Sequence, residues 1–396
     1  MHGHTEAHPH GGGRTELDVG AIVRRFGDAF VERHPVGHRA RRALIAIGRC
    51  RTAALGGHRY VCSHCTRAVS AYNSCRDRHC PKCEGARQHR WIEARRARLV
   101  RSSYFHVVFT LPAELRPIAR ANPSEIYALL FRSAAATLIE LGRDPRRLGG
   151  LVGVTAILHT WSRTLAFHPH VHCVVTAGGL SDDDERWRRS RRRYLFGVRV
   201  MGALFRGKML AGLRRLLAAG RLQLGGASAS LTETIGALYG KSWVVYAKKP
   251  FGGAEAVFRY LGQYTHRVGL ANSRLRAVSD GGITFTTRGG GTVTLHPFEF
   301  LRRFCQHVLP VGFVKIRHYG LMASVHAKTK LATAQRLLGG PPETDVAEAD
   351  EPSSEDTVEL ADLGSMLVAL RVGGRVRCPW CSRGHLRLEQ GGPDPP

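Results

Sequence analysis

The chain has 396 residues, of which 43% are hydrophobic, and a formal net charge of +28 at pH 7. This length suits two or three domains with their own cores, and no apolar run is long enough to span a membrane. Because 59 Lys and Arg stand against 31 Asp and Glu, the expected partner is a polyanion, with nucleic acid ahead of a membrane surface.

Residues 1–17 are rich in His and Gly. They contain no apolar run of the kind found in secretory signals, so we expect a disordered tail. The chain has ten cysteines, and eight of them fall into two clusters with short spacings. Without a secretory signal, such clusters favour zinc over disulfides and indicate a reducing cytoplasm.

Residues 18–101 are predicted to form a helical, zinc-binding domain. Apolar residues recur at helical spacing between residues 15 and 55. A cysteine-rich segment follows, and then a basic helix over residues 84–101. On that helix, Arg87 and Arg95 either contact phosphates or belong to a solvated face.

Two C-x-x-C pairs lie in the cysteine-rich segment, Cys62 with Cys65 and Cys80 with Cys83. Each pair turns the backbone so that both sulfurs face one point, and we expect the four thiolates to complete one closed, tetrahedral zinc site. Such a site has no open position, so its expected role is structural. Four neighbours offer either a second zinc site or alternative ligands to the first: Cys50, His58, Cys75 and His79.

Residues 102–338 mix strands and helices, which predicts an α+β layer structure. The expected strands span 105–111, 151–161, 170–176 and 243–247, with a hairpin formed by 283–287 and 292–295. The expected helices span 124–141, 203–219, 254–265 and 299–308. Ser124 is the expected N-cap of the first of these helices, and Gly178 and Gly179 are expected to end the third strand.

The third strand carries a histidine pair. Residues i and i+2 of a strand point the same way, so His170 and His172 project from one face and can hold a divalent cation together. A third ligand is expected from His159, on the preceding strand, or from the carbonyl oxygen of Gln263. Alternatively, His159 is a hydrogen-bonded core histidine.

A tyrosine pair follows in the helix expected over residues 254–265. Tyr260 and Tyr264 stand four residues apart, which places both phenols on one face of a helix. Their neighbours are polar and basic, including Arg267, which favours contact with a phosphate over burial in a core. The alternative is an amphipathic helix that buries two aromatic rings.

A basic run begins at Arg186. It either grips a single nucleic-acid strand, through Arg186 and Arg188 with Trp187 stacked on a base, or forms a disordered loop. Residues 339–365 are acidic and predict a linker. Residues 366–396 form a C-terminal tail with a C-x-x-C pair, Cys378 and Cys381, which is half of a metal site.

Four motifs carry a family resemblance. They are the segment 72–83, the segment 168–172, the segment 260–268 and the segment 316–320. In this order they resemble the two-tyrosine HUH transposases of rolling-circle insertion sequences, the IS91-type family, from about residue 18 to 338. The resemblance implies an antiparallel sheet flanked by helices after a small zinc-binding domain.

The resemblance also implies the chemistry. Tyr260 and Tyr264 are then the nucleophiles, His170 and His172 carry a catalytic Mg²⁺ or Mn²⁺, and the substrate is single-stranded DNA at the ends of a mobile element. The expected reaction cleaves and transfers strands through a 5′-phosphotyrosine. The expected location is the bacterial cytoplasm, at the nucleoid.

Two other functions stay open at this point. The same chemistry serves a plasmid replication initiator or relaxase, although a zinc segment ahead of the catalytic core favours a transposase. In a different class, the chain is a non-catalytic, zinc-containing DNA-binding regulator whose histidines and tyrosines are core residues. The sequence determines neither the target site nor the oligomeric state.

Overall fold

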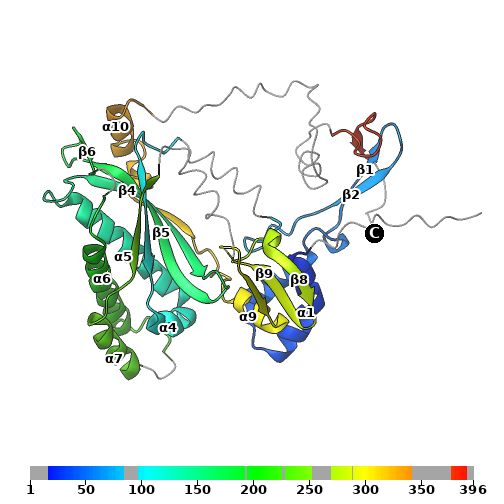
Figure 1. Ribbon diagram of the computed structural model, residues 1–396, viewed down its shortest axis with the longest axis horizontal. Coiled ribbons are helices and arrows are strands. Elements are labelled where there is room, and N and C mark those ends of the chain that lie inside the picture. Colours follow the sequence, from blue (N-terminus) through cyan, green and yellow to red (C-terminus); the bar gives the residue numbers. More distant parts are fainter. Residues whose placement is uncertain are drawn as a thin grey trace, which may run out of the picture.

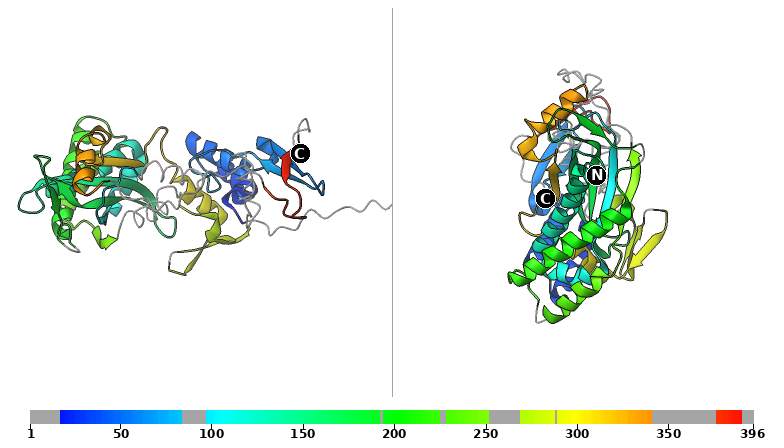
Figure 2. Two further views of the ribbon diagram at one scale, coloured as in Figure 1. Left: turned by 90° about the horizontal axis from the view of Figure 1, so that it is seen from above. Right: turned by 90° about the vertical axis from the view of Figure 1, so that its left-hand side faces the viewer.

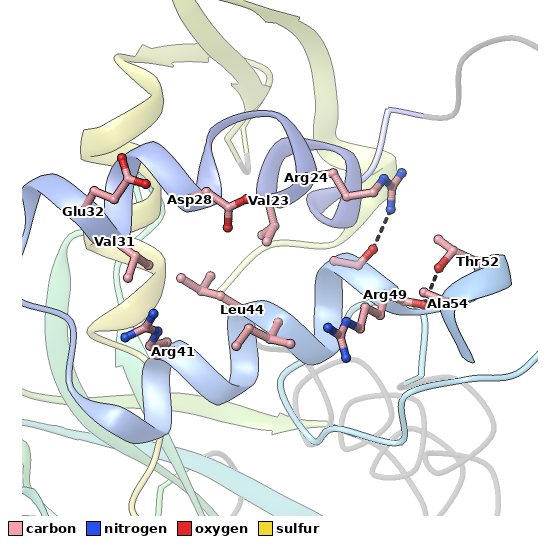
Figure 3. A pocket seen from close by; sticks show the side chains of 13 residues that line it. Val23, Arg24, Asp28, Val31, Glu32, Arg41, Leu44, Arg49, Thr52 and Ala54 are labelled. Atoms are coloured by element: carbon pink, nitrogen blue, oxygen red, sulfur yellow. Dashed lines mark hydrogen bonds between the residues drawn. The ribbon is translucent and has the colours of Figure 1, made fainter. Parts of the chain in front are cut away.

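The computed structural model describes residues 17–83, 97–191, 194–224, 228–251, 269–287, 289–340 and 376–389. Two helices open the chain, α1 (Val19–Arg33) and α2 (His38–Arg49). Asp18 caps α1 by accepting a hydrogen bond from the amide of Ala21 at 2.9 Å. Arg24 donates to the carbonyl of Gly48 at 2.9 Å across a cavity of about 450 Å³ between the two helices (Figure 3).

The core of α1 and α2 is shared with residues far along the chain. A small antiparallel sheet, with strand order β10-β9-β8, packs there together with α9 (Pro297–Cys305). Its strands are β8 (Leu275–Ser279), β9 (Gly282–Thr286) and β10 (Thr292–Leu295). Figure 1 shows α1, α9, β8 and β9 side by side. The predicted hairpin of β9 and β10 is confirmed.

The cysteine-rich segment forms a second small sheet. Its strands are β1 (Gly57–Cys62), β2 (Ala68–Tyr72) and β12 (Leu386–Leu388), in the order β12-β1-β2 and all antiparallel. The C-terminal segment 376–389 therefore lies against the N-terminal hairpin. Figure 2 shows both at one end of the molecule, with the largest sheet at the other.

The largest sheet is antiparallel throughout. Its order is β11-β4-β5-β3-β7, with β6 paired to β5. The strands are β3 (Tyr104–Thr110), β4 (Leu151–Trp161), β5 (Phe167–Leu180), β6 (Trp187–Arg189), β7 (Val245–Phe251) and β11 (Ile316–Gly320).

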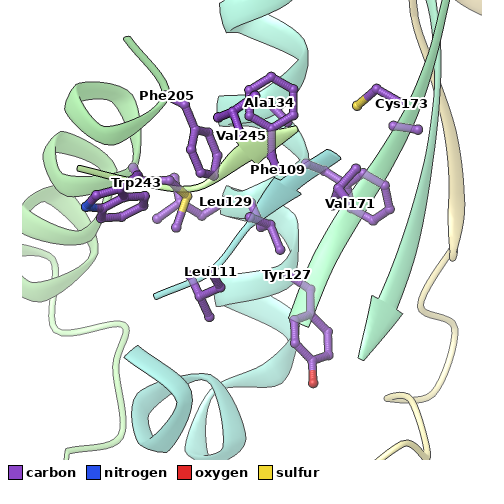
Figure 4. Close-up of a cluster of buried hydrophobic side chains, with 14 of the residues drawn as sticks. Phe109, Leu111, Tyr127, Leu129, Ala134, Val171, Cys173, Phe205, Trp243 and Val245 are labelled. Carbon is purple, nitrogen blue, oxygen red and sulfur yellow. The ribbon is translucent and has the colours of Figure 1, made fainter. Parts of the chain in front are cut away.

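Helices cover one face of this sheet. They are α4 (Arg116–Ala121), α5 (Pro123–Arg143), α6 (Val198–Ala218) and α7 (Ser228–Tyr239). Alternate residues of the strands, such as Phe109 and Val171, pack against Leu129 of α5 and Phe205 of α6 (Figure 4). This core fixes which face each residue of β3, β4 and β5 occupies.

Among the residues that the structure describes, an apolar cluster covers one end of the opposite face of the sheet. There Ile157 and Val174 pack with Leu321, Met322 and Leu331, the last of which belongs to α10 (Lys330–Leu337). The other end of this face carries histidines. The fold is thus α+β with antiparallel sheets flanked by helices, as predicted.

Two local predictions are wrong. The strand β5 does not stop at Gly178 and Gly179 but continues to Leu180. A side chain at Gly179 would meet the backbone of Gly150 at 2.7 Å, so the glycine permits close strand contact instead of ending the strand. The N-cap of α5 is Asn122, because Pro123 already occupies the first helical position; Ser124 lies inside the helix. The predictions also omitted α7 and β8.

The expected helix 254–265 lies outside the described residues, as do the N-terminal tail, most of the basic helix and the acidic linker. Among the described helices, none has the length and apolar character needed to cross a bilayer.

Candidate active site and metal centres

Three histidines gather at the other end of this face of the large sheet. His159 of β4 and His170 and His172 of β5 each place one ring nitrogen within 4.8 Å of the other two. The register explains this, because His159 lies directly opposite His170. The ring centroids of His159 and His172 are 4.3 Å apart, and those of His170 and His172 are 4.8 Å apart. Three neutral imidazoles around one point form a donor set for a divalent cation.

The sequence-derived expectation that His170 and His172 share a face is therefore confirmed, and His159 joins them. Whether they bind a metal stays a prediction. Gln263, the other candidate ligand, lies outside the described residues.

The surroundings of His170 favour a neutral ring. Burial lowers the pKa of His170 to about 4, so the imidazole is uncharged at neutral pH. Its Nδ1–H donates to the carbonyl oxygen of His168 at 2.7 Å. The Nε2 lone pair of His170 is thus left for an ion, as in metal sites whose ligands are oriented by a backbone carbonyl.

A fourth histidine, His106 of β3, supports the cluster. Its Nε2 lies 2.8 Å from Nδ1 of His172, and the two rings stack at 5.0 Å and 6°. Burial, helped by the charge of Lys248, lowers the pKa of His106 to about 3, so this ring is neutral. A cation held on Nε2 of His172 would keep the proton of this ring on Nδ1, which would then donate to Nε2 of His106. Sequence analysis missed this residue, although its parity in the strand Tyr104–Thr110 placed it away from the apolar face.

Replacing His106 with Phe is expected to weaken Mn²⁺ binding by about 10–100-fold, because the loss of a hydrogen bond to a ligating imidazole has effects of this size. His106→Gln keeps an acceptor and should retain most of the affinity. Calorimetric titration with Mn²⁺ measures both, and a thermal melt checks that each variant is folded. Equal affinity for wild type and the Phe variant would show that His106 does not position His172.

Positive charge surrounds the cluster. Arg116 donates to Nδ1 of His168 at 2.8 Å, and Lys248 lies exposed on β7 opposite His106. Lys315 places its ammonium 4.9 Å from the ring centroid of Trp161, which in turn stacks on His159. The cluster contains no carboxylate within the part of the chain that the structure describes. This arrangement suits a polyanion.

A cavity of about 690 Å³ opens beside the start of β5, between the α1–α2 connection, the α4–α5 region and α9. It is lined in part by Arg39, Arg120 and Arg302, and by the ring of Phe167. The guanidinium of Arg120 lies 5.5 Å from the centroid of that ring. The cavity is therefore basic, and it borders the helix-side core to which the buried Phe167 belongs.

Eight cysteines form two separate clusters. Cys50, Cys75, Cys80 and Cys83 place their sulfurs within 4.8 Å of one another, and the second cluster consists of Cys62, Cys65, Cys378 and Cys381. In the first, the sulfur of Cys83 lies 3.5 Å from that of Cys50 and 3.7 Å from that of Cys75. Zinc–sulfur bonds of about 2.3 Å in a tetrahedron place sulfurs about 3.8 Å apart.

The predicted grouping of Cys62, Cys65, Cys80 and Cys83 in one site is wrong. The hairpin of β1 and β2 separates them, because Cys62 lies at its tip, whereas Gly57 and Tyr72 pair at its base, close in sequence to Cys75. A strand of this length spans roughly 20 Å.

Neither histidine candidate joins a cysteine cluster. His58 is exposed on β1. His79 is buried, with Nδ1 at 2.9 Å from the carboxylate of Asp77 and Nε2 accepting from the amide of Leu309 at 3.1 Å. Burial lowers the pKa of His79, so a neutral ring fits this acceptor role. His79 thus links the cysteine-rich segment to Leu309, which follows α9 in the chain.

The first part of the basic run at Arg186 is not a disordered loop, because Trp187 and Arg188 belong to β6, which pairs with β5. The indole of Trp187 is half-buried over Gly178, where a side chain would meet Nε1 at 2.5 Å. Arg188 is exposed, and Arg186 forms an ion pair with Asp183 at 3.8 Å. Their contact with DNA stays a prediction. Three further DNA-contact candidates, Arg87, Arg95 and Arg267, lie outside the described residues.

An antiparallel sheet with a histidine cluster, a basic surround and a cysteine-rich N-terminal region defines a basic α+β protein with several candidate metal centres. Comparison with known proteins gives the family. A family model described as "Transposase zinc-binding domain" matches residues 22–111, and one described as "Putative transposase" matches residues 153–330.

Two bacterial relatives match most of the chain. "Putative transposase y4qJ" of Sinorhizobium fredii is 40% identical over 94% of this chain and 95% of its own length. "Transposase for insertion sequence element IS801" of Pseudomonas savastanoi pv. phaseolicola is 32% identical over 69% of this chain and 68% of its own. The chain belongs to the IS91-type two-tyrosine transposases with an N-terminal zinc-binding domain.

A solved structure, the conjugative relaxase TrwC in complex with mutant oriT DNA, aligns with 39% of this chain and 70% of its own. The sequence identity is 17% and the TM-score is 0.23. A likeness of this size adds nothing to the assignment.

Proposed function

We propose that this transposase cleaves and rejoins single-stranded DNA by a metal-dependent transesterification that passes through a 5′-phosphotyrosine. The observation that carries the proposal is the cluster of His159, His170 and His172, whose ring nitrogens lie within 4.8 Å of one another. The cluster is mounted on two long, paired strands with a packed core behind them. Such a mount holds ligands in a fixed geometry.

The donor set fits a divalent cation and favours Mn²⁺ over Mg²⁺. Mg²⁺ prefers oxygen ligands, whereas imidazole suits the transition metals. Neutral ligands leave the ion its whole charge. When bound, it supplies polarisation of the scissile phosphate and stabilises the charge that develops on the phosphate oxygens.

The residues around the cluster position the DNA. Lys248 and Lys315 lie on either side of the histidine face and suit the phosphates that flank the scissile bond.

The proposed nucleophiles are Tyr260 and Tyr264, outside the described residues. The described chain on either side of them supports the proposal. Phe251, before this segment, pairs with Tyr104 at one end of the sheet, and Gly269, after it, lies against Leu165 in the turn between β4 and β5. Phe251 and Gly269 therefore lie toward opposite ends of the strands that carry the histidine cluster.

In the proposed step, the phenolic oxygen of one tyrosine forms a bond to phosphorus as the bond from phosphorus to the 3′-oxygen breaks. The phenol gives its proton to solvent, and the leaving 3′-oxygen takes up a proton to become a hydroxyl. The phosphotyrosine keeps the bond energy, so no nucleotide cofactor is needed. The second tyrosine can cut another strand, and a 3′-hydroxyl then attacks a phosphotyrosine and releases the phenol.

The test uses single-stranded DNA from the end of the element, labelled at either end and incubated with the full chain and Mn²⁺. We expect a 3′ label to become attached to the protein in a product that survives SDS. A 5′ label should appear in a shorter free strand with a 3′-hydroxyl. Chelation with EDTA should stop both.

The same DNA as a fully paired duplex is the control, and we expect little adduct from it. A protein that binds both DNA forms but yields no adduct with either label would be a non-catalytic DNA-binding protein, and the proposal would be wrong. An adduct carrying the 5′ label would reverse the proposed polarity.

A further inference from the structure

We propose that Cys62, Cys65, Cys378 and Cys381 hold a Zn²⁺ of their own, and that this ion fastens the C-terminal end of the chain to the N-terminal β1–β2 hairpin. The matched zinc-binding family model ends at residue 111 and the transposase model ends at residue 330. Neither therefore covers Cys378 and Cys381. The proposal does not depend on the cleavage chemistry.

The sulfur positions fit a tetrahedral ion. The sulfur of Cys62 lies 3.7 Å from that of Cys381, and the sulfur of Cys65 lies 3.6 Å from that of Cys378. All four lie within 4.8 Å of one another. A disulfide would require about 2.05 Å, whereas thiolates around one zinc lie about 3.8 Å apart. Two residues separate the cysteines of each pair, which is the spacing of zinc knuckles.

The backbone around each pair has the turn that such a knuckle needs. The amides of His64 and Cys65 point at the sulfur of Cys62, at 3.3 and 3.4 Å. On the other side, the amide of Cys378 donates to the carbonyl of Gly384 at 2.8 Å and the amide of Ser382 donates to the carbonyl of Cys378. Both pairs therefore present their sulfurs from closed turns.

The C-terminal segment is docked as a strand. Leu386 pairs with Cys62 and Leu388 with Tyr60 in β1. Further contacts are the hydrogen bond from the amide of Ser63 to the carbonyl of His385 at 2.9 Å and the ion pair of Arg59 with Glu389 at 3.2 Å. The ligands are thus supplied by two segments that meet through backbone pairing.

The apolar core beneath this contact is small. Its buried members are Tyr60, Cys62, Ala71, Val376, Cys378 and Leu386, and two of these are proposed ligands. A unit of this size buries too little apolar surface to be stable alone, and small zinc modules obtain their folding energy from the metal. The ion is therefore expected to be the main link between the two ends of the chain.

Gly384 provides a way to test the docking without removing a ligand. A Cβ at this position would lie 2.7 Å from the sulfur of Cys62 and 2.8 Å from the amide nitrogen of His64. The methyl group that Gly384→Ala adds therefore cannot be accommodated unless the C-terminal segment moves away from the turn of Cys62 and Cys65.

The experiment replaces zinc by cobalt in the full-length protein, because thiolate-to-cobalt charge transfer reports only ions bound by sulfur and ignores those bound by histidine. The Cys378→Ser/Cys381→Ser variant removes two of the eight clustered sulfurs and leaves Cys62 and Cys65 alone, a pair too small to hold the ion. We expect the charge-transfer absorbance per chain to fall to about half that of wild type. Cys305→Ser changes a cysteine outside both clusters and should leave the absorbance unchanged.

The Gly384→Ala variant keeps all eight ligands, and we expect it also to lose cobalt absorbance at this site. Wild-type absorbance in the double cysteine variant would overturn the proposal, because the clustered sulfurs of the C-terminal segment would then bind no ion. Loss of all absorbance in that variant would also overturn it, because the two clusters would not be independent sites.

Discussion

Replacing His170 and His172 together with alanine is expected to abolish covalent adduct formation on single-stranded DNA. The double variant removes two of the three clustered ring nitrogens. A single remaining imidazole, that of His159, cannot hold a divalent ion at useful concentrations. Loss of even one group that stabilises developing charge slows an enzyme by about 10²–10³-fold, and losing the ion should slow it more. The measurement is the yield of SDS-stable adduct against time in Mn²⁺.

DNA binding separates a chemical defect from a folding defect. The charges that suit phosphate, such as Lys248 and Lys315, remain in the variant, so its affinity for the same DNA should stay close to wild type. His168→Ala is the matched control, because it alters a histidine of the same strand that lies outside the cluster. If the His170/His172 variant formed adduct at the wild-type rate, the histidine cluster would not be the active site.

The Tyr260→Phe/Tyr264→Phe double variant is the second case in which we expect complete loss of adduct. Phenylalanine keeps the ring and removes the only oxygen that can bond to phosphorus. Each single variant should lose the adduct at its own tyrosine and keep the other. Peptide mapping of the adduct formed by wild type and by each single variant identifies the linked residue.

Tyr246→Phe is the control for this series, because Tyr246 is exposed on β7 in the same sheet as the histidines. It should form adduct like wild type. Metal binding should be unaffected in all the tyrosine variants, since the three clustered histidines are unchanged. If the double variant still formed an adduct, a different nucleophile would have to be found among the remaining residues.

Local periodicity predicted most of the sheet. The strand expected over 151–161 was observed with the same bounds, and the expected strand 105–111 differs from β3 by one residue at each end. In these segments apolar residues alternate with polar ones or form a continuous apolar run between polar turns. Both patterns are strong signals for a strand. The helix α7 also has a helical pattern, with Leu231, Ile235 and Leu238 buried, but its short length and many small residues hid it.

The prediction that Gly178 and Gly179 end a strand was wrong because these glycines allow close packing. At Gly178 and Gly179 the sequence alone offers a strand stop, since glycine often ends a strand. The structure shows that Trp187 and the backbone of Gly150 occupy the space of the missing side chains. A neighbour that arrives from another strand cannot be read from the local sequence.

The sequence by itself determined that His170 and His172 share a face, because alternation along a strand is a local property of the backbone. It also determined the family, through four short motifs in a fixed order. The sequence left His159 and Gln263 as alternative third ligands. Only the tertiary structure placed His159 with the pair and added His106, since both positions depend on the register between strands. Only the tertiary structure divided the cysteines into two sets, because Cys62 and Cys381 are 319 positions apart and meet through the pairing of β1 with β12.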